Sequence, residues 1–263
     1  QGEDTIDVAR TLNNLANVYF SSGNLEQAMS MYEKSLKIKR DRLGDTHEEV
    51  ANTLNNIAHV LFTSGQDNRS LEVYNQVLRI RREKFGRNNM SVASTLSTMG
   101  DVYLKKGTLN HAKTCFEESA VIRSQQSSRN LAEDARVYEN LGVVHGKLGN
   151  WKSAESYFTE SLKMKVSSLG QNHEEIPKTL DSLALALIEQ GRFDDAIKPL
   201  EDALRIRKSS FSSIEEITAL MTKIAFLQKK SGRPDLALQM YADIERLEAT
   251  EGTGVVSEHY ASF

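Results

Sequence analysis

Six glycines recur at almost constant intervals along the 263 residues, and this period constrains the fold more than any other feature of the sequence. Successive spacings are 42, 42, 42, 42 and 41 residues, for Gly23, Gly65, Gly107, Gly149, Gly191 and Gly232. A period of this size is typical of solenoids, in which each unit buries its apolar face only against its neighbours. The sequence therefore predicts an array of repeats instead of one or two globular domains.

Each repeat is expected to contain two amphipathic helices joined at the glycine. Apolar residues lie eleven, eight, seven and four positions before it, as in Leu12, Leu15, Ala16 and Tyr19, and these positions fall on one helical face. A small residue five positions after the glycine and a large one nine positions after it begin the second helix, as in Ala28 and Tyr32. Large residues that meet small ones on a partner helix are typical of an antiparallel helix pair.

These features together resemble a known repeat family. The large–small–aromatic spacing and the segments TLNNLANVY, TLNNIAHVL, LGDTHEEVA and LGQNHEEIP resemble the tetratricopeptide repeat in its 42-residue, kinesin-light-chain-like form, over about residues 6–248. The resemblance implies an all-α fold, a right-handed α-α superhelix of six helix hairpins over residues 1–249. Residues 250–263 carry no helical pattern and are expected to form a disordered tail. The joint at residues 124–130, SQQSSRN, lacks the Leu-Gly pair of other joints and is expected to be looser.

Three positions on the first helix of each repeat lie opposite the apolar face, thirteen, nine and six residues before the glycine. In the family that the chain resembles, this face lines a concave groove where Asn and basic residues contact peptides. Asn can donate and accept hydrogen bonds, while Arg and Lys form charge-assisted bonds with carboxylates. We therefore expect an extended peptide, acidic or with a free C-terminal carboxylate. The candidate peptide-binding residues are Arg10, Asn14, Asn17, Asn52, Asn56, His59, Arg136, Asn140 and Lys178.

No pattern in the sequence predicts catalysis, a metal site or a cofactor site. His47-Glu48-Glu49 begins like a zinc-binding helix but lacks the second histidine, and Gly142 to Lys147 is too short for a phosphate loop. His47 and His173 occupy equivalent joints and are expected to be structural. The net charge of −3 and the missing aromatic platforms argue against nucleic acid, and no apolar run reaches the ~20 residues of a membrane span. Basic runs near the ends of second helices are expected to complement helix dipoles.

The leading hypothesis is a non-enzymatic scaffold that binds a protein or peptide partner. The alternative is a regulatory or oligomerisation module whose catalytic part lies outside this sequence, and self-association is compatible with both. Cys115 is the only cysteine, which favours a reducing, cytoplasmic compartment. Because no initiator Met or signal peptide opens the chain, we expect it to be part of a longer protein.

Overall fold

The computed structural model describes residues 5–210 and 213–252, and within these ranges the chain forms twelve α-helices and no strands. The all-α repeat fold predicted from the sequence is therefore confirmed. The helices are α1 (Ile6–Ser21), α2 (Leu25–Leu43), α3 (Glu48–Thr63), α4 (Asp67–Phe85), α5 (Met90–Lys105), α6 (Leu109–Ser124), α7 (Leu131–Lys147), α8 (Trp151–Leu169), α9 (Ile176–Glu189), α10 (Phe193–Ser209), α11 (Ile214–Lys230) and α12 (Pro234–Gly252).

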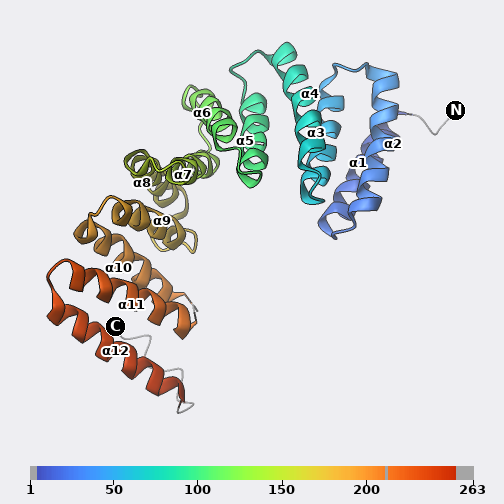
Figure 1. Cartoon of the computed structure of the whole chain (residues 1–263). Helices are drawn as coiled ribbons and strands as arrows, with labels where there is room; N and C mark the ends of the chain where they lie inside the picture. The colour runs from blue at the N-terminus through green and yellow to red at the C-terminus, as the bar shows by residue number, and fades with distance from the viewer. Residues whose placement is uncertain (1–4, 211–212, 253–263) are drawn as a thin grey trace. The chain divides into compact units, whose positions relative to one another are not determined.

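Helices pack in consecutive pairs, α1 with α2 through α11 with α12, and each pair is joined at one of the six periodic glycines (Figure 1). These glycines have φ between +74° and +79°, a left-handed conformation that disfavours residues with a Cβ. At the first turn, the amide of Gly23 donates to Phe20 O at 3.0 Å and that of Asn24 to Tyr19 O at 2.9 Å. Helix ends of this kind commonly place Gly in the left-handed position, which explains why a glycine recurs at this turn in every repeat.

Within each pair, small residues on the first helix let large residues of the second helix approach. A Cβ added to Gly100 would lie 2.6 Å from the ring of Phe116, and one added to Gly142 would lie 2.6 Å from Phe158. Ala58 occupies the corresponding position in the second repeat and is fully buried. The structure thus supports the interlocking of large and small residues that the sequence predicts.

The contacts divide the chain between residues 127 and 128, inside the joint that was expected to be looser. Unit 1 contains α1 to α6 and unit 2 contains α7 to α12, whereas the sequence analysis treated residues 1–249 as one array. The last helix extends to Gly252, three residues beyond the predicted boundary at 249. Residues 253–263, the rest of the predicted tail, lie outside the described residues.

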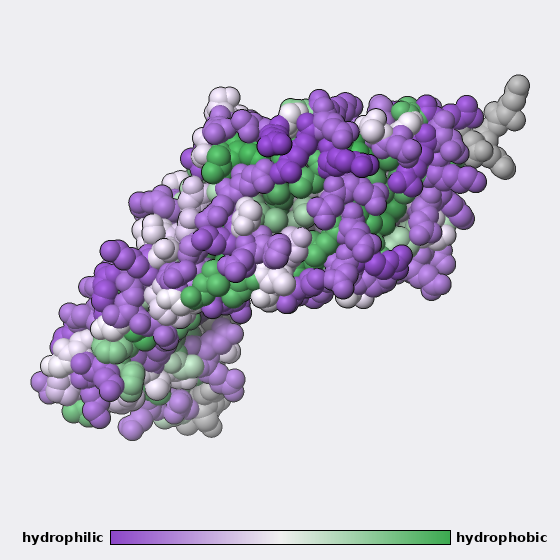
Figure 2. Space-filling model, turned by 45° about the horizontal axis from the view of Figure 1, so that its top comes forward, coloured by the Kyte–Doolittle hydropathy of each residue, from purple (hydrophilic) through white to green (hydrophobic). Residues whose placement is uncertain are grey.

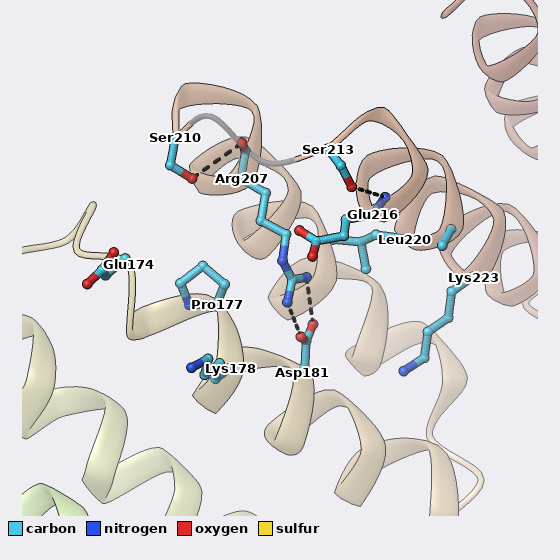
Figure 3. Close-up of a pocket in the computed structure, with 11 residues that line it drawn as sticks. Glu174, Pro177, Lys178, Asp181, Arg207, Ser210, Ser213, Glu216, Leu220 and Lys223 are labelled. Atoms are coloured by element: carbon cyan, nitrogen blue, oxygen red, sulfur yellow. Dashed lines mark hydrogen bonds and ion pairs between the residues drawn. The ribbon is translucent and has the colours of Figure 1, made fainter. Parts of the chain in front are cut away.

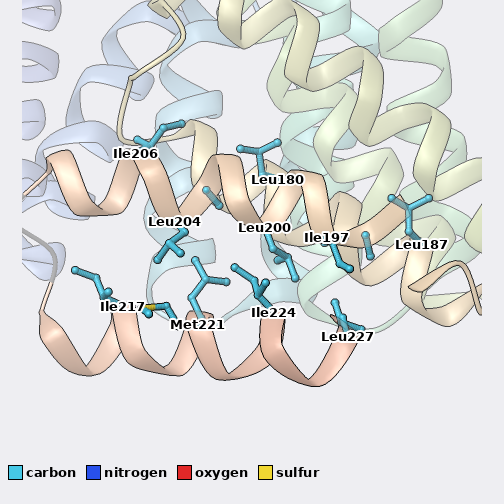
Figure 4. Close-up of a cluster of buried hydrophobic side chains, with 14 of the residues drawn as sticks. Leu180, Leu187, Ile197, Leu200, Leu204, Ile206, Ile217, Met221, Ile224 and Leu227 are labelled. Carbon is cyan, nitrogen blue, oxygen red and sulfur yellow. The ribbon is translucent and has the colours of Figure 1, made fainter. Parts of the chain in front are cut away.

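Each unit has buried apolar clusters that pass from one helix pair to the next. In unit 1, one cluster joins Ala16 and Tyr32 to Leu54 and Val77, and so connects α1 to α4. The main cluster of unit 2 spans α9 to α12, and Figure 4 shows several of its side chains interdigitating between α9, α10 and α11. Repeats stacked in this way bury a continuous core that no single helix pair could form alone.

The first helices of several repeats begin with side-chain caps at the joints. His47 caps α3, because its Nδ1 atom accepts a hydrogen bond from the amide of Glu49 at 3.1 Å. The Nδ1 atom of His173 accepts from the amide of Glu175 at 3.3 Å in the turn before α9, which has no side-chain cap. Asn130 and Ser213 cap α7 and α11 by accepting from the amides of Glu133 and Glu216. The two joint histidines therefore have the structural role expected from their equivalent positions.

Candidate partner-binding face

The residues thirteen, nine and six positions before each turn glycine form what we call the first-helix face. In unit 1 it consists of Arg10, Asn14, Asn17, Asn52, Asn56, His59, Ser94, Thr98 and Asp101. In unit 2 it consists of Arg136, Asn140, Val143, Lys178, Ser182, Leu185, Ala219, Lys223 and Phe226. All of these residues are exposed or half-buried, so the nine sequence-predicted candidates are accessible from solvent.

Two candidates of unit 1, Arg10 and Asn56, contact side chains across the α1–α3 boundary. Arg10 Nη2 donates to Glu49 Oε1 at 2.6 Å, and Asn56 Nδ2 lies 3.5 Å from Asn13 Oδ1. The hydrogen bond from Arg10 lowers the pKa of Glu49, and the same bond raises the pKa of Arg10. Part of the charge of Arg10 is therefore already matched inside the molecule, which makes it a weaker anchor than its exposure suggests.

Two asparagines of unit 1 use their carbonyl oxygens internally. Asn17 Oδ1 accepts from Tyr32 Oη at 2.6 Å, and Asn52 Oδ1 accepts from Arg81 Nη2 at 3.0 Å. Both residues are exposed, and their side-chain NH2 groups can still donate. A partner that offers carbonyl or carboxylate oxygens therefore fits this part of the face better than one that offers only donors.

The remaining candidates are also placed by neighbouring side chains. The ring of His59 lies 4.9 Å from that of Phe20, centroid to centroid, and Arg136 Nη2 lies 3.7 Å from Glu133 Oε2. Asn14 is exposed, and Asn140 is half-buried on α7. Each candidate is thus accessible to a partner within its own unit.

Unit 2 contains a pocket of about 930 Å³ between α9, α10 and α11 (Figure 3). At its centre Arg207 forms a bidentate ion pair with Asp181, with nitrogen–oxygen distances of 3.2 and 2.5 Å. The first-helix face contributes Lys178 from α9, and Ala219 and Lys223 from α11. The other lining residues are Glu174, Pro177, Ser210, Ser213, Glu216 and Leu220.

The two lysines are the cations of this pocket that a ligand can use. Asp181 neutralises Arg207, whereas neither Lys178 nor Lys223 forms an ion pair with another described residue. Figure 3 shows the two lysines on opposite sides of Asp181, each on its own helix. The sequence analysis identified Lys178 but missed Lys223, because the sixth repeat is the least regular; its position nine residues before Gly232 was the available signal.

A row of basic residues sixteen positions after the first five turn glycines was also missed, and its members are buried or half-buried. Lys39 Nζ donates to Thr53 Oγ1 at 3.0 Å and Lys165 Nζ to Thr179 Oγ1 at 3.1 Å, so each joins its helix to the following repeat. Burial lowers the pKa of Lys39. The row comprises Lys39, Arg81, Arg123, Lys165 and Arg207. The basic runs that the sequence analysis assigned to helix-dipole complementation include Lys39, Arg81 and Arg207, and these three residues bond to side chains of other helices.

Unit 2 differs from unit 1 in having apolar residues on its first-helix face. Leu185 is 44% exposed and Phe226 is 51% exposed, both six positions before a turn glycine. Lys230 Nζ lies 5.6 Å from the centroid of the Phe226 ring. Figure 2 shows hydrophobic areas within a mostly hydrophilic surface. The face of unit 2 can therefore offer apolar contact area beside its lysines.

Two further kinds of site concern residues 5–210 and 213–252, a metal centre and a membrane-spanning helix. These residues include no group of three His, Cys, Asp or Glu side chains that could hold a metal ion. Nor does any helix in these ranges have the length and apolar character needed to cross a membrane.

The fold and the face define a class of protein, the helix-hairpin repeat proteins that present one row of helices to a partner. A tetratricopeptide repeat model matches residues 7–83, 91–165 and 133–209. The chain belongs to the tetratricopeptide repeat family, whose repeats form protein–protein interaction scaffolds and are typically non-enzymatic. No curated protein sequence matches the chain.

Solved structures with the same architecture include kinesin-light-chain-like proteins. BtubC (BKLC) from P. vanneervenii is 15% identical, with a TM-score of 0.66 over 89% of this chain and 94% of its own. A kinesin light chain-type protein of Podosopora anserina with nearly identical TPR-like repeats is 18% identical, with a TM-score of 0.67 over 80% and 99%. PilF of Pseudomonas aeruginosa is 22% identical, with a TM-score of 0.62 over 92% and 93%. At these identities the likeness establishes the fold.

Proposed function

We propose that the protein is a non-catalytic scaffold that binds an extended peptide segment, acidic or with a free C-terminal carboxylate, along its first-helix face. The observation that carries this proposal is the pocket of about 930 Å³ in which Lys178 and Lys223 have no anionic partner among the described residues. Lysine ammonium groups form charge-assisted hydrogen bonds with carboxylates, which are stronger than neutral ones.

The surroundings of the pocket favour a peptide over a small anion. Leu185 and Phe226 lie on the same two helices as Lys178 and Lys223 and are exposed. A partner that places a carboxylate between the lysines can therefore also bury an apolar side chain against the same face. In unit 1 the free NH2 groups of Asn17 and Asn52 can donate to backbone carbonyls without selecting a sequence.

Other residues bear on the cellular compartment and on the class of partner. Cys115 is the only cysteine of the sequence, so no disulfide can form within the chain, and we place the scaffold in a reducing compartment such as the cytoplasm. A peptide partner is favoured over nucleic acid because hydrogen bonds inside the molecule engage one basic residue from each of the runs that end α2, α4 and α10, namely Lys39, Arg81 and Arg207.

The test uses fluorescence anisotropy with a defined probe, a fluorescein-labelled ten-residue peptide of alternating Asp and Leu with a free C-terminus. We expect the double variant Lys178→Ala/Lys223→Ala to weaken binding by about tenfold or more, equivalent to about 1.4 kcal/mol. The matched control is Lys163→Ala/Lys198→Ala, which removes the same charge from exposed positions on the second helices α8 and α10.

The same measurement separates charge from shape. A peptide in which Asn replaces Asp and the C-terminus is amidated should bind the wild-type chain more weakly than the acidic peptide does. The Lys178→Ala/Lys223→Ala variant should bind the two peptides with equal affinity. If both double variants bind the acidic peptide as the wild type does, with unchanged circular dichroism, the pocket is not the binding site. If the control variant weakens binding as much as the pocket variant, the peptide is attracted by the overall charge of unit 2 and not by the pocket.

A further inference from the structure

The first helix of the chain has an apolar face that the other repeats bury. Val18 is 64% exposed and Leu15 is 41% exposed, at five and eight positions before Gly23. In the other repeats the residues five positions before the glycine are at most 2% exposed: Val60, Val102, Val144, Ala186 and Leu227. In α3 and α5 this face lies towards the second helix of the preceding repeat, since α2 packs on α3 and α4 on α5.

The last helix has the complementary open face. Leu238 is 67% exposed and Tyr241 is 38% exposed, at six and nine positions after Gly232. Six positions after the glycine in the other repeats, Leu71 is 7% exposed and Ile197 is 4% exposed, while Met29, Lys113 and Glu155 are half-buried. The residues nine positions after the glycine, Tyr32, Tyr74, Phe116, Phe158 and Leu200, are at most 4% exposed.

The contacts between repeats show what fits these two faces. The exposed residues of α1 occupy the repeat positions through which α3 packs on α2. The exposed residues of α12 occupy the repeat positions through which α10 packs on α11. We propose that α12 of one copy packs on α1 of a second copy, so that the stacking of repeats continues between copies. This contact is heterologous, because the two copies use different surfaces. It is independent of peptide binding on the first-helix face.

The charges at this contact predict that it is weak and strengthened by salt. Inside the chain, Lys39 Nζ lies 3.6 Å from Glu49 Oε2 across the α2–α3 contact. Glu248 occupies the register of Lys39, and Asp7 occupies the register of Glu49. Two acidic side chains would therefore approach each other between copies, and salt reduces repulsion between exposed charges. The change Glu248→Lys should restore the attractive pair and tighten association by about fivefold.

The experiment is sedimentation velocity of the 263-residue chain over a wide range of protein concentrations. The weight-average mass should rise above 29.5 kDa as the concentration increases. The variants Val18→Glu and Leu238→Glu should each remain monomeric, because each loses one of the two faces. When mixed, they should form a one-to-one dimer and nothing larger, because each variant keeps the face that the other lacks.

A control variant tests whether a new charge alone could prevent association. Val121→Glu adds the same charge at a valine that is 55% exposed, at a register where other repeats carry Lys37, Arg79, Lys163 and Arg205. This variant should associate as the wild type does. Circular dichroism of all three variants should match the wild type, because each substituted side chain is mostly exposed.

Each contrary result overturns the proposal in a recognisable way. Dimers of Val18→Glu alone would show that α12 pairs with α12, and dimers of Leu238→Glu alone would show that α1 pairs with α1. A wild-type chain that stays monomeric at every concentration and salt would show that the faces do not meet. Association that appears only after deletion of residues 253–263 would show that this segment, not a second copy, occupies α12.

Discussion

The two units build the same helix pairs from the same core rows, but their first-helix faces carry different chemistry. Six positions before the turn glycine, unit 1 has Asn17, His59 and Asp101, whereas unit 2 has Val143, Leu185 and Phe226. The core rows show no such contrast, since a small residue faces a large one in both units, as in Ala58 with Tyr74 and Ala184 with Leu200. The comparison indicates that the core rows determine the fold, and that the face is free to differ with the partner bound.

The largest expected effect tests whether the two units are energetically separate. Phe116 and Leu200 are both fully buried, one in each unit, and replacing either with Ala should cost about 3–5 kcal/mol of unfolding free energy. Hydrogen exchange should speed up only in residues 5–127 for Phe116→Ala and only after residue 128 for Leu200→Ala. Equal acceleration of both units by either variant would mean that the chain unfolds as one cooperative body.

A second prediction exchanges the chemistry of the two faces. The double variant Leu185→Asn/Phe226→His gives unit 2 residues of the unit 1 type at exposed positions, so its stability should not change. Binding of the Asp-Leu peptide should weaken by about tenfold, because about 1.4 kcal/mol of apolar contact is lost. The control Val121→Asn removes an exposed valine from the second helix α6, outside the first-helix face, and should not change binding. If the Leu185→Asn/Phe226→His variant binds as tightly as the wild type, the apolar row takes no part in recognition.

A third prediction concerns the close packing of Gly100 on Phe116. Gly100→Ala should destabilise unit 1 by about 1–2 kcal/mol, because overpacking costs about 1–3 kcal/mol and the better helix propensity of Ala recovers less than that. Adding Phe116→Leu recreates the Ala184–Leu200 combination of the fifth repeat and should cost less than the sum of the two single changes. Strict additivity in a double-mutant cycle of urea denaturation would contradict the proposed steric contact.

The smallest expected effect is on the pH dependence of unit 1. The hydrogen bond from Arg10 lowers the pKa of folded Glu49, so this contribution to stability is present above the unfolded pKa of ~4.3 and is lost as the pH falls through the folded pKa. Glu49→Gln should therefore make the melting temperature of unit 1 fall less steeply on acidification. Glu155, whose pKa is also lowered, provides the matched variant Glu155→Gln in unit 2. An unchanged slope for Glu49→Gln would show that the ion pair is not linked to folding.

Much of the fold could be predicted because a repeated sequence tests the same inference six times. The turn glycines, the small residues such as Gly142 and the joint histidines all have the roles that their fixed positions indicate. Three features could not be predicted in the same way. The basic residues such as Lys165 look solvent-exposed in sequence, and only the packed helices show that they are buried between repeats. Lys223 lies in an irregular repeat, and the division between residues 127 and 128 depends on long-range contacts.

The first-helix face could be predicted in position but not in detail. Periodicity identifies which residues are accessible, such as Asn14 and Lys178. It does not show that the carbonyl oxygens of Asn17 and Asn52 are already used by Tyr32 and Arg81, because these bonds cross between helices. The structure therefore adds a second argument for the acceptor-bearing partner that we propose, because these two asparagines keep only their donor groups for a partner.

Photo-crosslinking tests most directly whether the first-helix face is the surface that meets a partner. Burial raises the pKa of Cys115 to about 11, so a cysteine introduced by Ser182→Cys can be labelled selectively with a benzophenone maleimide near neutral pH. Lys163→Cys on the exposed side of α8 provides the matched outer position. Our account predicts that the Asp-Leu peptide crosslinks to the Ser182→Cys protein and not to the Lys163→Cys protein, and that unlabelled peptide competes. Crosslinking at position 163 with none at position 182 would contradict it.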